Sequence, residues 1–269
     1  MTDQHAAFVG SIPEHYDKYL GPALFEPYAS DLAEHVKVAP GASVLEIGCG
    51  TGILTRILRD RLAQSVKLVA TDLNPAMMEF AVKKFAAAEN VEFKQADAAD
   101  LPFVENSFDA VVCQFGFMFV SDKEKAFREV RRVIIPNGQF CFNLWDALEL
   151  NELAWIAHTT IKRFFDQNPP AFYEIPFSMH DSEEVLALLE AVGFREIDIS
   201  LLKLRSVSHS ASEVAKGLIR GNPVIAAIEE RANASPTEIE QVVAAEVAAR
   251  CGDFPVQARM QAFVFKCVG

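Results

Sequence analysis

Three glycines and one acid stand close together in a stretch that can bind a charged ligand. The stretch Val44–Gly52 begins as a short apolar strand around Glu46 and then alternates Gly48, Gly50 and Gly52. Alternating glycines allow a tight turn, and a ligand can lie against bare N–H groups where the next helix begins. A carboxylate is unusual in a buried parallel strand, so Glu46 predicts a ligand ammonium or hydroxyl as its partner. The G-x-G-x-G spacing differs from the G-x-G-x-x-G of dinucleotide-binding turns.

Asp72 is a second acid at a position that predicts ligand chemistry. It follows a second apolar strand, Lys67–Thr71, and lies twenty residues after Gly52. In a doubly wound α/β fold, an acid at this point can accept two hydrogen bonds from ribose hydroxyls. The alternative is an N-cap for the helix that starts near Pro75, and both roles can coexist.

The elements that must position these residues alternate between strands and helices. Ser107–Gln114 is almost continuously apolar, as a central strand of a parallel sheet should be. This alternation predicts an α/β fold with a doubly wound, mostly parallel sheet. The expected strands span residues 44–47, 67–71, 91–96, 107–114, 139–145, 194–204 and 258–268.

Residues 12–145 resemble the class I S-adenosylmethionine (SAM) dependent methyltransferases, in their ubiquinone- and menaquinone-biosynthesis-like branch. Val44–Gly52 matches that family's first motif at every position, and four further motifs follow in order. Asn137 stands where the family has glycine, a mild departure because asparagine tolerates left-handed backbone angles. The resemblance implies the Rossmann-like methyltransferase fold, with seven strands in the order 3-2-1-4-5-7-6 and an antiparallel seventh strand. It implies SAM as the cofactor and S-adenosylhomocysteine as the product.

The resemblance also implies a set of cofactor-binding residues. Asp97 would accept from the exocyclic amine of adenine, and the N–H of Ala98 would donate to a ring nitrogen. Leu73 and Met77 would lie against the adenine ring, while Gln114 would lie at the methionine end. The full set is Tyr16, Glu46, Gly48, Cys49, Gly50, Asp72, Leu73, Met77, Asp97, Ala98 and Gln114.

The segment before the first motif has two open interpretations. Residues 12–38 read as helical, with a break expected at Pro22 because proline cannot continue the helical hydrogen bonds. The segment either covers an edge of the sheet or, as the resemblance implies, folds Tyr16 and Asp17 over the cofactor.

The rest of the chain is interpreted as core elements interrupted by insertions. The helical insertions would cap the acceptor site, or serve plain packing or a homodimer interface. Residues 166–177 are rich in proline and aromatics and read as a lid loop. The expected divisions are an N-terminal helical segment at 1–40, a SAM-binding core at 41–145, an insertion with the lid loop at 146–180, a core helix and strand at 181–205, a helical cap insertion at 206–257 and a final core strand at 258–269.

The composition limits which partners the protein is expected to bind and in which cellular compartment we expect it. The net charge is −12, from 37 acids and 25 bases, which argues against non-specific binding of nucleic acid. The five cysteines form no C-x-x-C pair, so we expect no metal site. The N-terminus lacks a basic segment followed by an apolar run, and no apolar run is long enough to cross a bilayer. We therefore expect a cytoplasmic protein without stable membrane insertion.

The sequence thus predicts a SAM-dependent methyltransferase that acts on a small, partly apolar organic acceptor by in-line displacement. It names no catalytic residue; His158, His180 and His209 lie in or near the expected cap, where a histidine can act as a base. The acceptor and the choice among O-, C- and N-methylation stay open. One alternative is a SAM-binding scaffold without turnover. Another is a nicotinamide-dependent oxidoreductase, whose turn would have its third glycine at position 53, which is Ile53.

Overall fold

The computed structural model describes residues 8–269, which form two compact units. Residues 1–7, which include most of the N-terminus that lacks a basic segment followed by an apolar run, lie outside the described part. Of the described residues, unit 1 comprises 8–27, 146–178 and 203–261, and unit 2 comprises 28–145, 179–202 and 262–269.

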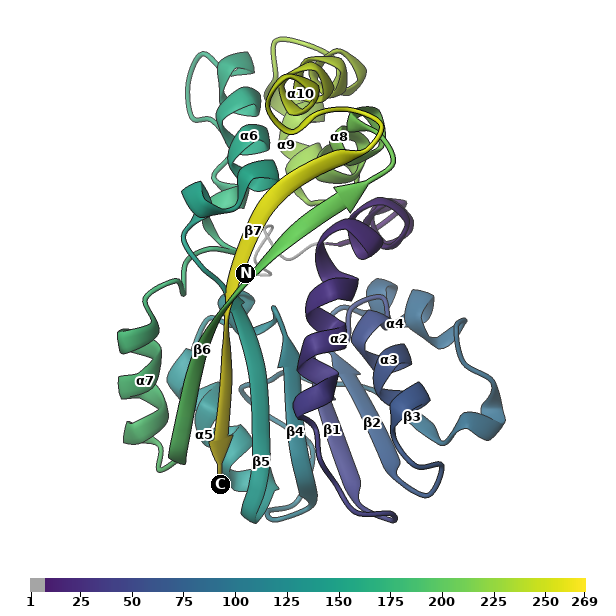
Figure 1. Cartoon of the computed structure of the whole chain (residues 1–269), viewed down its shortest axis with the longest axis vertical. Coiled ribbons are helices and arrows are strands. Elements are labelled where there is room, and N and C mark those ends of the chain that lie inside the picture. The colour runs from purple at the N-terminus through teal and green to yellow at the C-terminus, as the bar shows by residue number, and fades with distance from the viewer. Residues whose placement is uncertain (1–7) are drawn as a thin grey trace. The chain divides into compact units, whose positions relative to one another are not determined.

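A seven-stranded sheet runs in the order β3-β2-β1-β4-β5-β7-β6 (Figure 1). The pairs β1–β2, β2–β3, β1–β4 and β4–β5 are parallel, and β5–β7 is antiparallel. The fold class and strand order predicted from the sequence are therefore confirmed. The strands are β1 (Ser43–Ile47), β2 (Lys67–Asp72), β3 (Val91–Gln95), β4 (Phe108–Gln114), β5 (Ile134–Trp145), β6 (Arg195–Ser208) and β7 (Val256–Val268).

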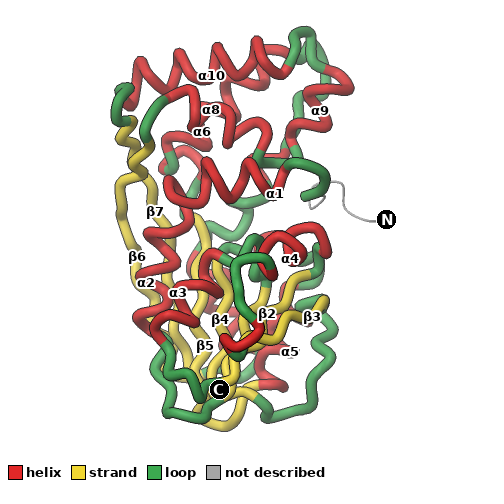
Figure 2. The backbone as a smooth tube through the Cα atoms, turned by 90° about the vertical axis from the view of Figure 1, so that its right-hand side faces the viewer, coloured by secondary structure: helices red, strands yellow, loops and turns green. Residues whose placement is uncertain are grey.

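Helices cover both faces of the sheet in unit 2. Helices α2 (Glu26–His35) and α3 (Ile53–Arg61) lie on one face, and α5 (Lys123–Val133) lies on the other (Figure 2). Helix α7 (Ser182–Ala191) packs against α5. Helix α4 (Pro75–Val82) follows β2. The short 3₁₀ turns of this unit are η3 (Ala87–Glu89) and η4 (Phe117–Phe119).

Each face of the sheet has its own apolar core. On the α2 and α3 face, Leu32 and Leu58 pack with Val44 of β1 and Leu68 of β2. The other face is aromatic, and the fully buried rings of Phe142 and Phe265 stack at 4.6 Å between β5 and β7. Burying such a side chain contributes about 1.5–3 kcal/mol. The central strands are therefore held in place by apolar packing on both of their faces.

Unit 1 is mainly helical. Helices α6 (Glu152–Ile161), α8 (Ala211–Arg220) and α10 (Pro236–Cys251) lie side by side in both views (Figures 1 and 2). Close packing of α8 against η2 (Tyr16–Phe25) depends on Gly217, because a Cβ there would lie 2.8 Å from Tyr19 and Leu20 side-chain atoms. The remaining helices are α1 (Ile12–His15), α9 (Val224–Arg231), η5 (Leu148–Leu150), η6 (Lys162–Phe164) and η7 (Phe172–Glu174).

The expected helix break at Pro22 is wrong. The chain continues from α1 through the π-helix η2, which contains Pro22, into α2. In an α-helix the proline ring meets the carbonyl four residues earlier, whereas the wider π-turn relieves that contact. The segment expected as a lid loop contains η7, and Phe172, Tyr173 and Phe177 are buried there. The Tyr173 hydroxyl donates to the Leu218 carbonyl at 2.6 Å.

The five cysteines are all free and buried. Burial raises the pKa of each thiol, so all are protonated near neutral pH. Within residues 8–269 no group of three or more His, Cys, Asp or Glu side chains is placed to hold a metal ion. In the same residues, no helix is both long enough and apolar enough to cross a membrane.

Candidate functional site

The glycine turn between β1 and α3 lies at the point where the strand order reverses. Gly48, Gly50 and Gly52 have φ angles of 69°, 55° and 81°, which L side chains rarely adopt. The N–H of Cys49 donates to the Thr71 carbonyl at 2.9 Å, which fixes the turn to the end of β2. In doubly wound sheets, ligands bind beyond the carboxyl ends of the strands at this point.

Asp72 braces the glycine turn. Its Oδ2 accepts from the N–H of Gly50 at 2.8 Å, and its Oδ1 accepts from the N–H of Asn74 at 2.7 Å. The N-cap of α4 is Asn74, whose side chain accepts from Ala76 and Met77, so the N-cap alternative for Asp72 is wrong. Burial raises the pKa of Asp72, and these backbone donors oppose the rise. The N–H of Leu73 also lowers this pKa, and because a carboxylate can accept about four hydrogen bonds, Asp72 can still accept from a ligand hydroxyl.

Glu46 is a buried carboxyl group without a full set of partners. Its side chain is 1% exposed, and Oε2 has no hydrogen-bond partner among the described residues. Burial raises the pKa of Glu46 to about 8, and the nearby charge of Asp72 adds to the rise, while contact with Thr55 opposes it. A buried carboxyl with an unused oxygen fits a cationic or hydroxyl-bearing ligand group, as the sequence predicts.

The segments after β2 and β3 lie next to each other. The N–H of Ala96 donates to the Asp72 carbonyl at 3.1 Å, so Asp97 and Ala98 begin one residue beyond that contact. Leu73 is 59% exposed, whereas Met77 is buried, and its methyl group would lie 3.6 Å from a Cβ on Gly50. An exposed apolar side chain and a buried thioether beside the turn are suited to an apolar ring system.

The exit from β4 contains a feature that the sequence argument missed. Phe115, which follows Gln114, has a φ of 49°, and its N–H donates to Oδ1 of Asn143 at 3.1 Å. Asn143 is 1% exposed, and its Nδ2 has no partner among the described residues. The signal was a lone amide in the otherwise apolar run from Phe140 to Trp145.

An aromatic wall stands at the carboxyl ends of β4 and β5. We use this name for Phe115, Trp145 and Tyr28. The rings of Phe115 and Trp145 stack at 3.8 Å with an interplanar angle of 1°, and Tyr28 meets both edge-on at 5.4 and 5.2 Å. Because parallel strands end at the same edge of a sheet, this wall and the glycine turn share that edge.

The remaining candidate residues are Tyr16 and three histidines, and they do not all belong to the same unit. Tyr16 belongs to unit 1, where its ring stacks on Phe25 at 4.6 Å. Of the three histidines, His158 is buried in unit 1, with Nε2 3.8 Å from a Glu174 oxygen and Nδ1 lacking a hydrogen-bond partner. Burial lowers the pKa of His158, and the charge of Lys162 lowers it further. His180 and His209 are exposed.

Comparison with known proteins identifies the family. A family model described as a methyltransferase domain matches residues 45–142. A ubiquinone/menaquinone biosynthesis C-methyltransferase, UbiE, of Legionella pneumophila (strain Paris) is 30% identical over 187 residues, 64% of this chain and 73% of the relative. The chain belongs to the SAM-dependent methyltransferases. The UbiE of Hahella chejuensis is 42% identical over 105 residues, which is 38% of this chain and 42% of that protein.

Solved structures of other proteins share the fold. The chain aligns with YcgJ of Bacillus subtilis at a TM-score of 0.59 and 19% identity, over 90% of this chain and 98% of YcgJ. It aligns with phosphoethanolamine N-methyltransferase 2 of Haemonchus contortus at a TM-score of 0.63 and 14% identity, over 100% of this chain and 61% of that chain. At these identities the likeness shows the fold alone.

The enzyme is thus a methyltransferase that uses SAM. SAM supplies a methyl group already activated on a positively charged sulfur, so the chain mainly has to bind the cofactor, align an acceptor and exclude water. The comparisons support neither the scaffold nor the nicotinamide alternative. Ile53 stands where the nicotinamide turn has its third glycine, and it packs against the core of unit 2.

Proposed function

We propose that this enzyme methylates a carbon atom of a small, partly apolar aromatic acceptor of the quinol or phenol class. The observation that carries the proposal is the similarity to proteins named C-methyltransferases of ubiquinone and menaquinone biosynthesis, at 30% identity over 73% of the Legionella protein. The aromatic wall supports an apolar, ring-bearing acceptor, since its buried rings lie at the same edge of the sheet as the glycine turn. The unpartnered Nδ2 of Asn143 offers a donor for an oxygen on such a ring.

We propose the following cofactor contacts on the same grounds. Glu46 pairs with the ammonium of the methionine part, and Asp72 accepts from the ribose hydroxyls through its remaining lone pairs. Asp97 and Ala98 bind the edge of adenine, with Leu73 and Met77 against its face. Gly48, Cys49 and Gly50 provide the turn, Gln114 lies toward the methionine end, and Tyr16 closes over the cofactor.

The cellular setting is also proposed. The acidic surface and the small-molecule acceptor point to a cytoplasmic enzyme that acts without nucleic acid and without a metal. We propose a homodimer as the assembly state, tested by light scattering on the purified enzyme. Activity that survives a chelator would support the prediction of metal-free catalysis.

Transfer of a labelled methyl group tests the proposed reaction. The enzyme is incubated with SAM that carries carbon-13 in its methyl group. The acceptors are matched phenols or quinols that differ in which position is left unblocked: a ring carbon, a hydroxyl or an amine. We expect a labelled carbon–methyl product, which the carbon-13 shift separates from oxygen- and nitrogen-methyl products. Label only on oxygen or nitrogen would overturn C-methylation, and SAM binding without transfer to any acceptor would favour the scaffold alternative.

The cofactor contacts are tested separately by calorimetry with S-adenosylhomocysteine. Asp72→Ala should weaken binding at least about 100-fold, because two hydrogen bonds to a charged group contribute about 1.5–3 kcal/mol each. Asp60→Ala is the matched control, because Asp60 is an exposed acid that pairs with Arg56 on α3. Unchanged affinity in Asp72→Ala would refute the proposed ribose contact.

A further inference from the structure

Glu129 and Arg132 form a doubly bonded ion pair on α5. Nε of Arg132 donates to Oε1 of Glu129 at 2.7 Å, and Nη2 donates to Oε2 at 2.7 Å. These hydrogen bonds hold the pKa of Glu129 below its ordinary value and raise that of Arg132. Such a bidentate pair has a fixed geometry, unlike most surface ion pairs.

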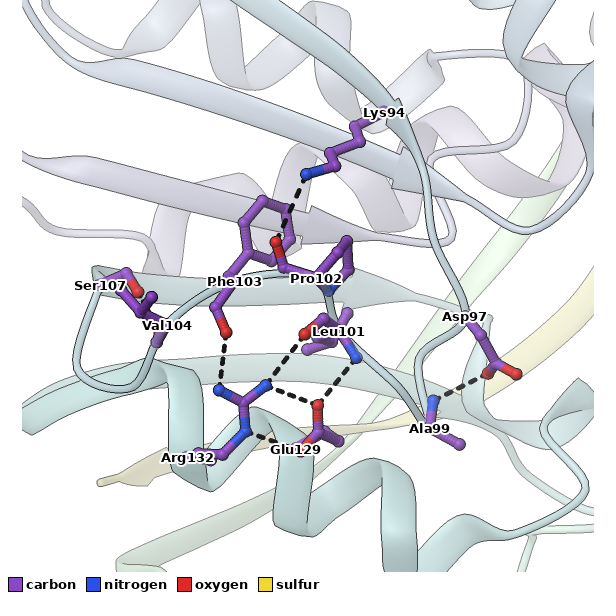
Figure 3. A network of polar contacts seen from close by, with 10 residues as sticks. All are labelled: Lys94, Asp97, Ala99, Leu101, Pro102, Phe103, Val104, Ser107, Glu129 and Arg132. Carbon is purple, nitrogen blue, oxygen red and sulfur yellow. Dashed lines mark hydrogen bonds and ion pairs between the residues drawn. The ribbon is translucent and has the colours of Figure 1, made fainter.

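The same two side chains bind the backbone of the segment after β3. The N–H of Leu101 donates to Oε2 of Glu129 at 2.8 Å. In turn, Arg132 donates to the carbonyls of Leu101, at 3.0 Å, and Phe103, at 2.7 Å (Figure 3). Both backbone polar groups of Leu101 are therefore bound by this pair, some thirty residues later in the sequence.

Leu101 directly follows the turn that contains Asp97. The N–H of Asp100 donates to the Asp97 carbonyl at 3.0 Å, and the N–H of Ala99 donates to Oδ1 of Asp97 at 2.8 Å. One end of this turn continues from β3, and its other end is held at Leu101 by α5 (Figure 3). The position of the Asp97 carboxylate thus depends on both anchors.

We propose that Glu129 and Arg132 are positioning residues that hold the segment 97–101 in the shape that recognises adenine. The proposal rests on the proposed adenine contacts of Asp97 and Ala98, and it adds a determinant outside the cofactor-binding set. The pair acts through the backbone of Leu101 and Phe103 and does not itself contact the cofactor.

Apolar contacts also hold this part of the chain, so its fold depends less on the ion pair than the position of its backbone does. Leu101 is buried by its own side chain, and the ring of Phe103 packs edge-on against Phe108 at 5.0 Å. The buried side chains of α5 are Ala126, Phe127, Val130 and Val133. Loss of the ion pair therefore frees the backbone of the segment while its apolar anchors remain.

Two ligands separate positioning from a general structural effect. S-adenosylhomocysteine carries the exocyclic amine that Asp97 would accept from, and S-inosylhomocysteine has an oxygen in its place. Calorimetry is performed with both ligands on the full chain and on Arg132→Gln. We expect the variant to bind S-adenosylhomocysteine about 10-fold more weakly, as for the loss of about one charged hydrogen bond, and to lose most of the wild-type preference for the amine.

Four further variants complete the experiment, one of them the single change Asp97→Asn. Arg128→Gln is the matched control, since Arg128 pairs with Glu124 on the same helix, and it should keep wild-type affinity. Glu129→Gln tests the other half of the pair, should Arg132→Gln not fold. Asp97→Asn combined with Arg132→Gln should lose less affinity than the two single changes added together, because both act on one recognition element.

The outcomes distinguish this inference from the proposed function. Equal weakening of both ligands, or unchanged affinity in folded Arg132→Gln and Glu129→Gln, would overturn the positioning role. If Asp97→Asn itself bound S-adenosylhomocysteine like the wild type, the proposed adenine contact would fail first. If Asp97→Asn lost affinity while both pair variants kept it, only the inference about α5 would fail.

Discussion

At the scale of single residues, Glu46 shows how a strand can carry a charge that the core opposes. It stands in β1 between Ala70 of β2 and Val112 of β4 in the register of the sheet. Burial favours the neutral acid, whereas a bound ammonium would favour the carboxylate. Ligand binding is therefore expected to release a proton from this residue when the pH lies below about 8.

This gives a prediction for stability against pH. The pKa of Glu46 is higher in the folded chain than its ordinary 4.5, so its stabilising contribution is full at low pH and is lost as the pH rises through about 8. The free energy of unfolding of the ligand-free enzyme, measured by thermal melting from about pH 5 to about pH 9, should therefore fall more steeply than that of Glu46→Gln. The difference should amount to a few kcal/mol across this range. Parallel curves would contradict the prediction.

At the scale of elements, two glycines of the turn between β1 and α3, Gly50 and Gly52, have different structural roles. A Cβ on Gly52 would lie 3.0 Å from the Cβ of Ala81, so Gly52 serves the packing of α3 against α4. A Cβ on Gly50 would meet no atom closer than 3.6 Å, which is ordinary contact. A Cβ on Gly50 would therefore touch the methyl group of Met77 without a clash, so packing does not require glycine here as it does at Gly52.

The two alanine variants should separate stability from binding. Gly52→Ala combines backbone strain with a tight contact, and we expect it to lower the free energy of unfolding by about 1–3 kcal/mol. Gly50→Ala carries only the strain, but its methyl group would occupy the ligand side, so cofactor affinity should fall more than stability. Chemical denaturation and calorimetry on both variants measure this; the reverse ranking would refute the division of tasks.

Much at this scale could be predicted from the sequence. The strands, the glycine turn and the acid at the end of β2 follow from apolar runs and spacing, which are local signals. Whether Asp72 caps α4 or braces Gly50 could not be read, because the answer depends on a contact across 22 residues. The bonds from Arg132 to Leu101 cross 31 residues, and the π-turns around Pro22 have no local signature.

At the scale of the whole molecule, the described part of the chain builds unit 1 from three separate segments, among them residues 8–27 and 203–261. Helix α8, from the third segment, packs on η2, from the first, through Gly217. That one contact joins parts of the chain about two hundred residues apart. The packing of these two distant segments in unit 1 therefore depends on the absence of a side chain at Gly217.

Gly217→Ala tests this dependence. The added methyl group would force Tyr19 or Leu20 to move, and we expect a loss of about 1–3 kcal/mol in the stability of unit 1. Hydrogen exchange should accelerate in η2 and α8 and stay unchanged in residues 43–72 of unit 2. Ser212→Ala, an exposed change on α8, is the control. Acceleration spread evenly over both units would contradict the division.

The buried thiols have a practical chemical consequence. Maleimides need an accessible thiolate, and each of the five cysteines is buried and has a raised pKa. The native enzyme should therefore resist alkylation, and one cysteine introduced at Val104, which is 77% exposed and follows Phe103, would be a single attachment point. A fluorophore there would report on the segment held by α5 each time the cofactor binds, without removal of any natural cysteine.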